Sequence, residues 1–217
     1  MFITTQGFKR LTKQAYKTRD LHIANDGLGY TIAGGYWRIW IKHDWIPKKE
    51  LAAIIELTGE LPAEGQAFTA CEDGNQYEIK FPDERNAMTI ALECKMTLEI
   101  TPLVLRYATE QQARVLQRAD TREITLINDQ FTDMISNKAI DYEKGESSVS
   151  GPFIHHREYG IFYRSDTMAM QIMPRTDDKN IELLRYLEHF DITGEQEDGL
   201  YGDGIPEGGK EKETEET

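Results

Sequence analysis

The sequence predicts an α+β fold built from repeated β-α-β-β-β units, with short helices on one face of antiparallel sheets and two similar subdomains. Three observations carry this prediction. A strand pattern, a short amphipathic helix and further strands recur along the 217 residues. Asn-Asp-Gly at 25–27 and Asp-Gly at 73–74 are typical hairpin turns. Residues 3–11 and 126–134 follow the same strand-to-helix pattern.

The first unit begins with a short strand at 1–6. A helix follows at 7–19, because Phe8, Leu11 and Ala15 recur at helical spacing. Three strands are then expected at 20–27, 28–35 and 36–43.

A second helix is expected at 47–59, since proline suits the first helical turn and Gly59 provides a C-terminal stop. A third is expected at 107–119, where small and apolar residues recur at helical spacing. The remaining helices are expected at 129–137 and 180–190, and the remaining strands at 65–74, 75–81, 86–100, 123–128, 139–145, 151–158 and 159–174.

These elements divide into two similar domains at 1–100 and 101–192, followed by a disordered acidic tail at 193–217. One mixed domain is the alternative to the pair. Residues 194–217 carry nine acids and two lysines, which is −7 of the net charge of −13. Such a tail either keeps the protein soluble or imitates DNA and competes for a basic surface.

The composition narrows the class of protein. With 39% hydrophobic and 29% charged residues the chain can build a packed core. A net charge of −13 repels nucleic acids and anionic lipid, so any contact with DNA needs a locally basic surface. Cys71 and Cys94 lack CxxC spacing, which favours a reducing cytoplasm. We expect neither a signal peptide nor a membrane span.

The expected helix at 7–19 provides such a surface. Residues 1–19 contain no acid, and Lys9, Lys13 and Lys17 form one line on the helix opposite its apolar residues, with Arg10 beside it. Like charges four residues apart disfavour a helix slightly, so an uninterrupted basic line favours a polyanion in front of it. A solvated helix face is the alternative interpretation.

A weaker basic pair lies on the expected helix at 107–119. Arg114 and Arg118 are four residues apart, and Glu110 and Asp120 offset part of their positive charge. Basic helices in an acidic protein suit phosphate contacts that do not depend on sequence. No helix-turn-helix, RNP motif or zinc finger indicates that bases are recognised.

The stretch "YWRIWIKHDW" at 36–45 is a candidate single-strand platform, because bases stack on aromatic rings while cations hold phosphates. Strand alternation places Trp37 on a core face. It leaves Trp40 as the one candidate stacking residue, beside Arg38 and Lys42.

No residue pattern identifies a reaction. His155 and His156 are adjacent on an expected strand, point to opposite faces and cannot easily hold one metal. Cys71 and Cys94 lack an evident base and are expected in the core. We therefore expect no enzyme, no metal and no cofactor.

The repeated units and two C-terminal segments resemble the DNA sliding clamps, the polymerase processivity rings. "LINDQFTDMIS" and "MAMQIMPR" are similar to the end of bacterial clamps, where an Asn-x-x-Phe/Tyr helix start precedes a strand ending in Met-Pro-x-Arg. The corresponding residues are Asn128, Phe131, Met173, Pro174 and Arg175. Here Arg175 follows Pro174 directly, and the chain continues beyond the point where a clamp would stop.

The resemblance implies a non-enzymatic ring, or part of one, that encircles duplex DNA and recruits other proteins. It implies that Lys9, Arg10, Lys13, Lys17, Arg114 and Arg118 face the DNA. Three hypotheses follow. The first is a clamp-like, sequence-independent DNA-binding protein of phage or mobile-element type, able to form a homo-oligomer. The second is a protein-interaction or scaffolding domain, and the third is a single-strand binder that uses the tryptophan strand.

Overall fold

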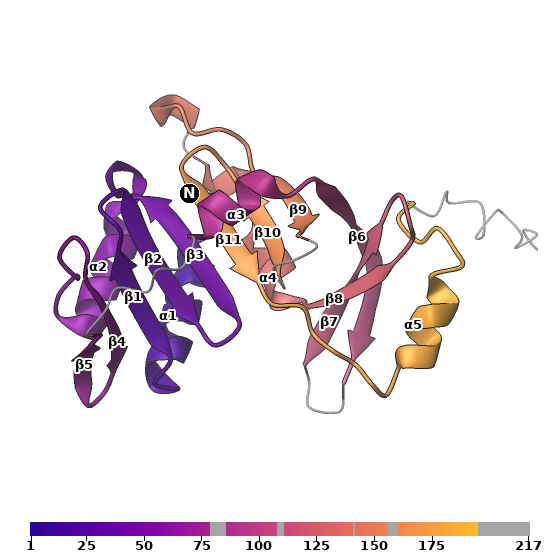
Figure 1. Cartoon of the computed structure of the whole chain (residues 1–217), viewed down its shortest axis with the longest axis horizontal. Helices are drawn as coiled ribbons and strands as arrows, with labels where there is room; N and C mark the ends of the chain where they lie inside the picture. Colours follow the sequence, from indigo (N-terminus) through magenta and orange to yellow (C-terminus); the bar gives the residue numbers. More distant parts are fainter. Residues whose placement is uncertain (79–85, 108–110, 141, 156–159, 195–217) are drawn as a thin grey trace, which may run out of the picture.

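The computed structural model describes residues 1–78, 86–107, 111–140, 142–155 and 160–194. In this part of the chain, eleven antiparallel strands form one sheet in the order β5-β4-β1-β2-β3-β11-β10-β9-β6-β7-β8 (Figure 1). The strands are β1 (Leu21–Asn25), β2 (Gly29–Gly34), β3 (Trp37–Lys42), β4 (Ala67–Cys71), β5 (Gly74–Tyr77), β6 (Met96–Arg106), β7 (Gln112–Arg118), β8 (Ile124–Asn128), β9 (Ser150–Ile154), β10 (Ile161–Arg164) and β11 (Met168–Ile172).

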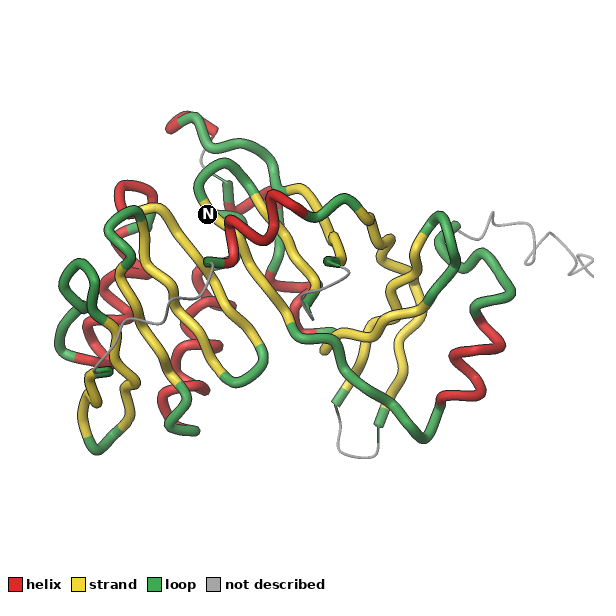
Figure 2. Tube along the Cα trace, in the orientation of Figure 1, coloured by secondary structure: helices red, strands yellow, loops and turns green. Residues whose placement is uncertain are grey.

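Short helices pack on the sheet, which confirms the α+β fold class. The helices are α1 (Thr5–Lys17), α2 (Lys48–Thr58), α3 (Ala87–Glu93), α4 (Gln130–Met134) and α5 (Ile181–Leu187), with 3-10 turns at His43–Trp45, Asn137–Ala139 and Tyr142–Lys144. The sheet gives the molecule its length, with the helices distributed along it (Figure 2).

The main core lies between the sheet and α1, α2 and α4. Phe8 and Leu11 of α1 are fully buried there, together with Ile54 of α2 and Phe131 of α4. Ile39 of β3 faces the same core from the sheet. Three of the helices therefore share one face of the sheet, as the sequence predicts.

The opposite face is covered by α3 and, farther along the sheet, by α5. Ile90 of α3 packs with Trp40 of β3 and Phe162 of β10. Leu184 of α5 packs with Val115 of β7. A helix was expected at 180–190, where α5 forms, whereas α3 was expected as a strand; both lie on the face opposite to α1, α2 and α4.

The three N-terminal strands are confirmed. β1 pairs with β2, with His22 opposite Ala33 at one end and Asn25 opposite Tyr30 at the other. β2 in turn pairs with β3, from Gly29 opposite Lys42 to Gly34 opposite Trp37. Of the first expected strand, 1–6, only the bridge between Ile3 and Ile135 forms, because α1 already starts at Thr5.

The helix expected at 107–119 is wrong where the structure describes it. Residues 112–118 form β7, which pairs with β6 on one side and β8 on the other. Val115 and Leu116 point to opposite sides of the sheet, into two different cores. A strand buried on both faces has apolar residues at consecutive positions, which single-sequence periodicity does not distinguish from a helix.

Two further predictions are corrected. The strand expected at 86–100 begins as α3, because Asn86 caps the helix by accepting a hydrogen bond from the N–H of Thr89, and Ala87, Ile90 and Ala91 share its buried face. The strand expected at 139–145 is instead a pair of 3-10 turns among the described residues.

One sheet runs through both expected domains. β3 belongs to the first expected domain and β11 to the second, and the two strands pair from Trp37 opposite Ile172 to Ile41 opposite Met168. β6 crosses the expected boundary at residue 100. The division into 1–100 and 101–192 stays a prediction, and residues 195–217 of the expected tail lie outside the described residues.

Candidate nucleic-acid interface

The helix α1 forms because local sequence and core burial agree. Thr4 caps its N-terminus by accepting a hydrogen bond from the N–H of Gly7 at 3.2 Å. Phe8, Leu11 and Ala15 recur at helical spacing and are buried against the sheet. The predicted helix and its buried face are confirmed.

The face of α1 that points away from the sheet is basic. Lys9, Arg10, Lys13 and Lys17 are all exposed. None of the four forms an ion pair with a residue in the described part of the chain. At a rise of about 1.5 Å per residue, the line from Lys9 to Lys17 is about 12 Å long. We call these four residues the α1 basic face.

The surroundings of this face are mixed. The helix α2 lies beside α1 and begins with two exposed lysines, Lys48 and Lys49, but Glu56 is exposed farther along it. Just after α1, Arg19 pairs with Asp73 at 2.8 Å. Next to the α1 basic face, Lys48 and Lys49 form no ion pair with a described residue, whereas Arg19 does.

Arg114 is in a different situation. Its Nε donates to Asp129 at 2.7 Å, and its Nη1 donates to the carbonyls of Thr101 and Pro102 at 3.3 Å. The side chain is 20% exposed. This arginine holds β6, β7 and the residue before α4 together, so its guanidinium is already engaged.

Arg118 is also engaged, by two carboxylates. It contacts Asp120 at 2.7 Å and Glu123 at 3.0 Å. The hydrogen bond with Asp120 is the largest cause that raises the pKa of Arg118. β7 is six strand positions from β2, the strand under α1, which is about 29 Å at the usual strand spacing. The structure does not place Arg114 and Arg118 with the α1 basic face.

Both tryptophans of β3 are buried. Trp37 is 4% exposed and lies in the main core, as predicted. Trp40 is 7% exposed, is covered by α3, and donates its indole N–H to Asp26 at 2.9 Å. Arg38 is half-buried and Lys42 is exposed. Trp40 therefore presents no face on which a base could stack.

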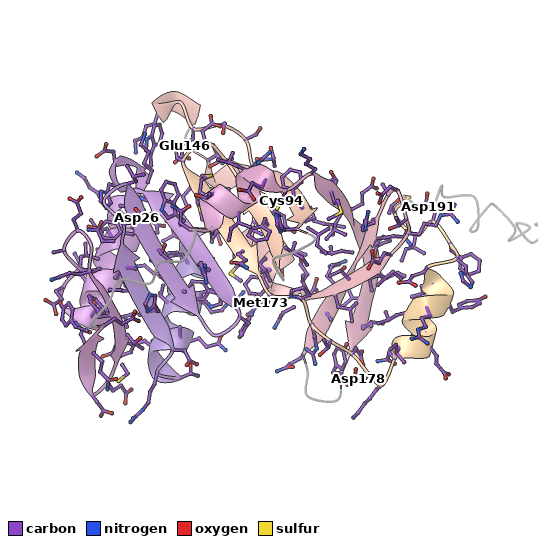
Figure 3. The ribbon with its side chains drawn as sticks, viewed as in Figure 1. Asp26, Cys94, Glu146, Met173, Asp178 and Asp191 are labelled. Carbon is purple, nitrogen blue, oxygen red and sulfur yellow. The ribbon has the colours of Figure 1, made fainter. Side chains whose placement is uncertain are left out.

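The sequence analysis did not predict the network around Asp26, which Figure 3 labels. Its carboxylate accepts hydrogen bonds from Trp40, Asn86 and the N–H groups of Leu28 and Gly29. Burial raises the pKa of Asp26, but these hydrogen bonds outweigh it, and the pKa is lowered. The Asn-Asp-Gly turn was the available signal, and it indicates a hairpin without showing what the carboxylate contacts.

A cavity of about 550 Å³ brings together Glu93, Cys94 and His155, residue types that can act in catalysis. Burial raises the pKa of Cys94 to about 11, and its thiol donates to the carbonyl of Ile90 at 3.4 Å. A thiol with that pKa stays protonated at neutral pH, so the geometry does not support a cysteine nucleophile. Within the described residues, no group of three His, Cys, Asp or Glu side chains is placed to hold a metal ion.

No protein-family model matches the chain, and no curated protein sequence matches it. One solved structure is similar in part, the beta chain of DNA polymerase III from Streptococcus pneumoniae. The similarity has 10% sequence identity and a TM-score of 0.37, and it covers 82% of this chain and 65% of that one.

In the described residues, no helix is both long and apolar enough to span a membrane.

Proposed function

We propose that this chain is a non-enzymatic protein that binds the phosphate backbone of DNA through the α1 basic face, without recognising its sequence. The observation that supports this most is the α1 basic face itself, where four exposed cations that form no ion pair with a described residue share one helix face in a chain of net charge −13. Arg19, Arg114 and Arg118, by contrast, are each paired with an acid.

Duplex DNA fits this face better than a single strand. The side chains exposed on α1 are cations and glutamines, with no aromatic ring among them. Cations alone bind phosphates, whereas a single-strand site combines them with rings on which bases stack. A duplex carries one charge per about 1.7 Å of its axis, so about seven phosphates lie along the 12 Å line of lysines.

We extend this proposal to a clamp-like role in replication, in which several copies surround DNA and other proteins bind outside. Its support is the arrangement of this chain, with a cationic helix on one face of a long antiparallel sheet. Light scattering on the purified protein tests the extension. A dimer or trimer fits a ring, and a monomer at all concentrations contradicts it.

The alternative of a protein-interaction domain has one observation in its favour. Ile181, Leu183, Tyr186 and Phe190, in and just after α5, are between 43% and 59% exposed. Apolar side chains gathered on one short helix are typical of a contact with another protein. The alternative of a single-strand binder is disfavoured by the burial of Trp40.

The DNA proposal is tested by reversing three charges. Lys9→Glu/Lys13→Glu/Lys17→Glu should abolish most binding, measured by fluorescence anisotropy with a labelled duplex at several salt concentrations. With four phosphate contacts, the wild-type log–log salt slope is about −3.6, and the variant should lose most of it. The matched control Lys95→Glu/Lys179→Glu/Arg185→Glu makes the same change in net charge at exposed positions outside α1. Equal affinity and slope in both variants would mean that α1 is not the binding surface.

A further inference from the structure

The N-terminus of α2 opens into a cavity of about 580 Å³. The start of α1 lines the same cavity through Ile3 and Thr5, and Trp45 and Ile46 form an apolar wall. Glu146, labelled in Figure 3, lies at its edge and pairs with the amine of Met1 at 2.5 Å. A volume of this size is in the range of small-molecule sites.

The first turn of α2 has no cap. Pro47 occupies the N-cap position and provides no side-chain hydrogen bond. The N–H groups of Lys48 and Lys49 make no hydrogen bond with any residue in the described part of the chain. N–H groups at this position point out of the end of a helix and, with its dipole, attract anions. Both lysine side chains are exposed and line the cavity.

Glu50 is the second, independent observation. It lines the cavity and is only 2% exposed, and its carboxylate forms no ion pair or hydrogen bond with a described residue. A glutamate at the third helical position usually reaches back to the N–H of the N-cap residue, but Pro47 has no N–H. The carboxylate thus meets the cavity without a donor from the described protein, and the cavity suits a molecule that donates to Glu50.

One group of atoms meets both requirements. The amides and lysines need an anion, while Glu50 needs a hydrogen-bond donor and repels an anion that has none. We propose that this cavity binds a protonated phosphate, as hydrogen phosphate or as a phosphate monoester. Its oxygens accept from the N–H groups of Lys48 and Lys49, and its P–OH donates to Glu50. This inference does not depend on DNA binding by the α1 basic face.

The charged groups around the cavity favour one such anion. They are Lys48, Lys49, Lys144 and the amine of Met1 against Asp44, Glu50 and Glu146. The positive groups exceed the acids by one, and the end of α2 adds partial positive charge. A phosphodiester inside a nucleic-acid chain carries no proton, so the site selects a free phosphate or a terminal monoester.

Sulfate is the decisive comparison, because it has similar size and shape but no proton near pH 6, where about half of a phosphate monoester is still protonated. Isothermal titration of the full chain at about pH 6 should show phosphate binding about tenfold or more tighter than sulfate, the effect of one charge-assisted hydrogen bond. Equal binding of the two anions, or binding of neither, would overturn the proposal and leave the cavity to water.

Variants separate the two halves of the site. Glu50→Gln should bring the ratio of the phosphate affinity to the sulfate affinity close to one, because an amide can donate a hydrogen bond to either anion. Glu56→Gln, at an exposed position of the same helix, should keep the wild-type ratio. Lys48→Ala/Lys49→Ala should weaken the binding of both anions without changing the ratio of their affinities. An unchanged ratio in Glu50→Gln would contradict the role of Glu50, and if that variant does not fold, the wild-type comparison decides.

Two further arms identify the source of the phosphate and keep this site apart from the proposed function. Inorganic phosphate is compared with a short oligonucleotide that carries a 5′-phosphate or a 5′-hydroxyl. A difference between the oligonucleotides supports a terminal monoester, and selective binding of inorganic phosphate alone supports free phosphate. Lys9→Glu/Lys13→Glu/Lys17→Glu should keep the phosphate-to-sulfate ratio, whatever happens to DNA binding. Loss of the ratio in that variant would contradict a separate site.

Discussion

Replacing Asp26 tests a junction between three parts of the fold. One carboxylate oxygen accepts hydrogen bonds from the N–H groups of Leu28, at 2.9 Å, and Gly29, at 2.7 Å. The other accepts from the indole N–H of Trp40 at 2.9 Å and the side-chain amide of Asn86 at 3.0 Å. One side chain thus ties the first hairpin turn to β3 and to the cap of α3.

We expect Asp26→Ala to lower the free energy of unfolding by about 3 kcal/mol. The indole N–H of Trp40 is buried, and leaving it without an acceptor costs about 1–3 kcal/mol. The turn amides are nearer to solvent and add about 1 kcal/mol together. For a chain of this length, the change corresponds to a fall of about 6–12 °C in Tm. Urea unfolding followed by circular dichroism measures it.

The same junction predicts a pH dependence. Burial opposes ionisation of Asp26, but its four hydrogen bonds hold its pKa below the ordinary value. A lowered folded-state pKa stabilises the protein above the unfolded-state pKa, near 3.9, and this contribution disappears as the pH falls through the folded-state pKa. The difference in stability between wild type and Asp26→Asn should therefore be constant at neutral pH and shrink below about pH 4.

Asp20→Ala is the matched control, since Asp20 is an exposed acid just before β1. It should change stability by less than about 0.5 kcal/mol. If Asp26→Ala is as mild as this control, the hydrogen bonds of Asp26 do not hold the junction together, and the reasoning fails.

Three other predictions follow from burial, hydrogen bonding and charge. The hydroxyl of Tyr163 is buried without a hydrogen-bond partner among the described residues, so Tyr163→Phe should leave stability unchanged or raise it by about 1 kcal/mol. Tyr107→Phe, which removes the hydrogen bond to Asp177, should lower it by about 1 kcal/mol in the same urea assay. Deleting residues 195–217 removes a net charge of −7 and should raise DNA affinity several-fold at low salt, a gain that high salt removes. Equal affinities at low salt would show that the tail does not oppose DNA.

The parts of the fold that the sequence predicts well are those in which local pattern and tertiary burial agree. Phe8, Leu11 and Ala15 repeat at helical spacing and are buried on one side of α1. The first hairpin turn and Gly59, which ends α2 in the left-handed conformation, are determined by backbone preferences of a few residues. Such elements need no information from distant parts of the chain.

The errors occur where distant contacts decide the structure. In β7, Val115 and Leu116 are both buried because β6 and β8 flank the strand and cores lie on both faces, a situation that no short window of sequence reveals. The helix α3 has only seven residues, and its core partners come from β3, β10 and β11. Sheet order is also a tertiary property, and nothing local indicates that β3 lies beside β11.

The same distinction applies to the candidate site. The exposure of Lys9, Lys13 and Lys17 follows from the helical period alone, so the line was visible in the sequence. Asp120 was already noted beside Arg118 in the sequence, but the ion pairs of Arg114 with Asp129 and of Arg118 with Glu123 became apparent only with the strand pairing and its connections. Likewise, an uncapped proline start is visible at 47, but the burial of Glu50 depends on the cavity around it.

The structure also allows the lysine test to separate an effect on DNA binding from an effect on stability. On α1 the residues that hold the core and the residues proposed to bind DNA occupy opposite faces, and the exposed lysines contribute nothing to the core cluster. Replacing them should therefore change the electrostatic surface while Phe8 and Leu11 keep the helix in place. In the full-length chain, a loss of DNA binding in the triple variant with unchanged unfolding would identify a charge effect. A parallel loss of stability would instead show that the α1 basic face supports the fold.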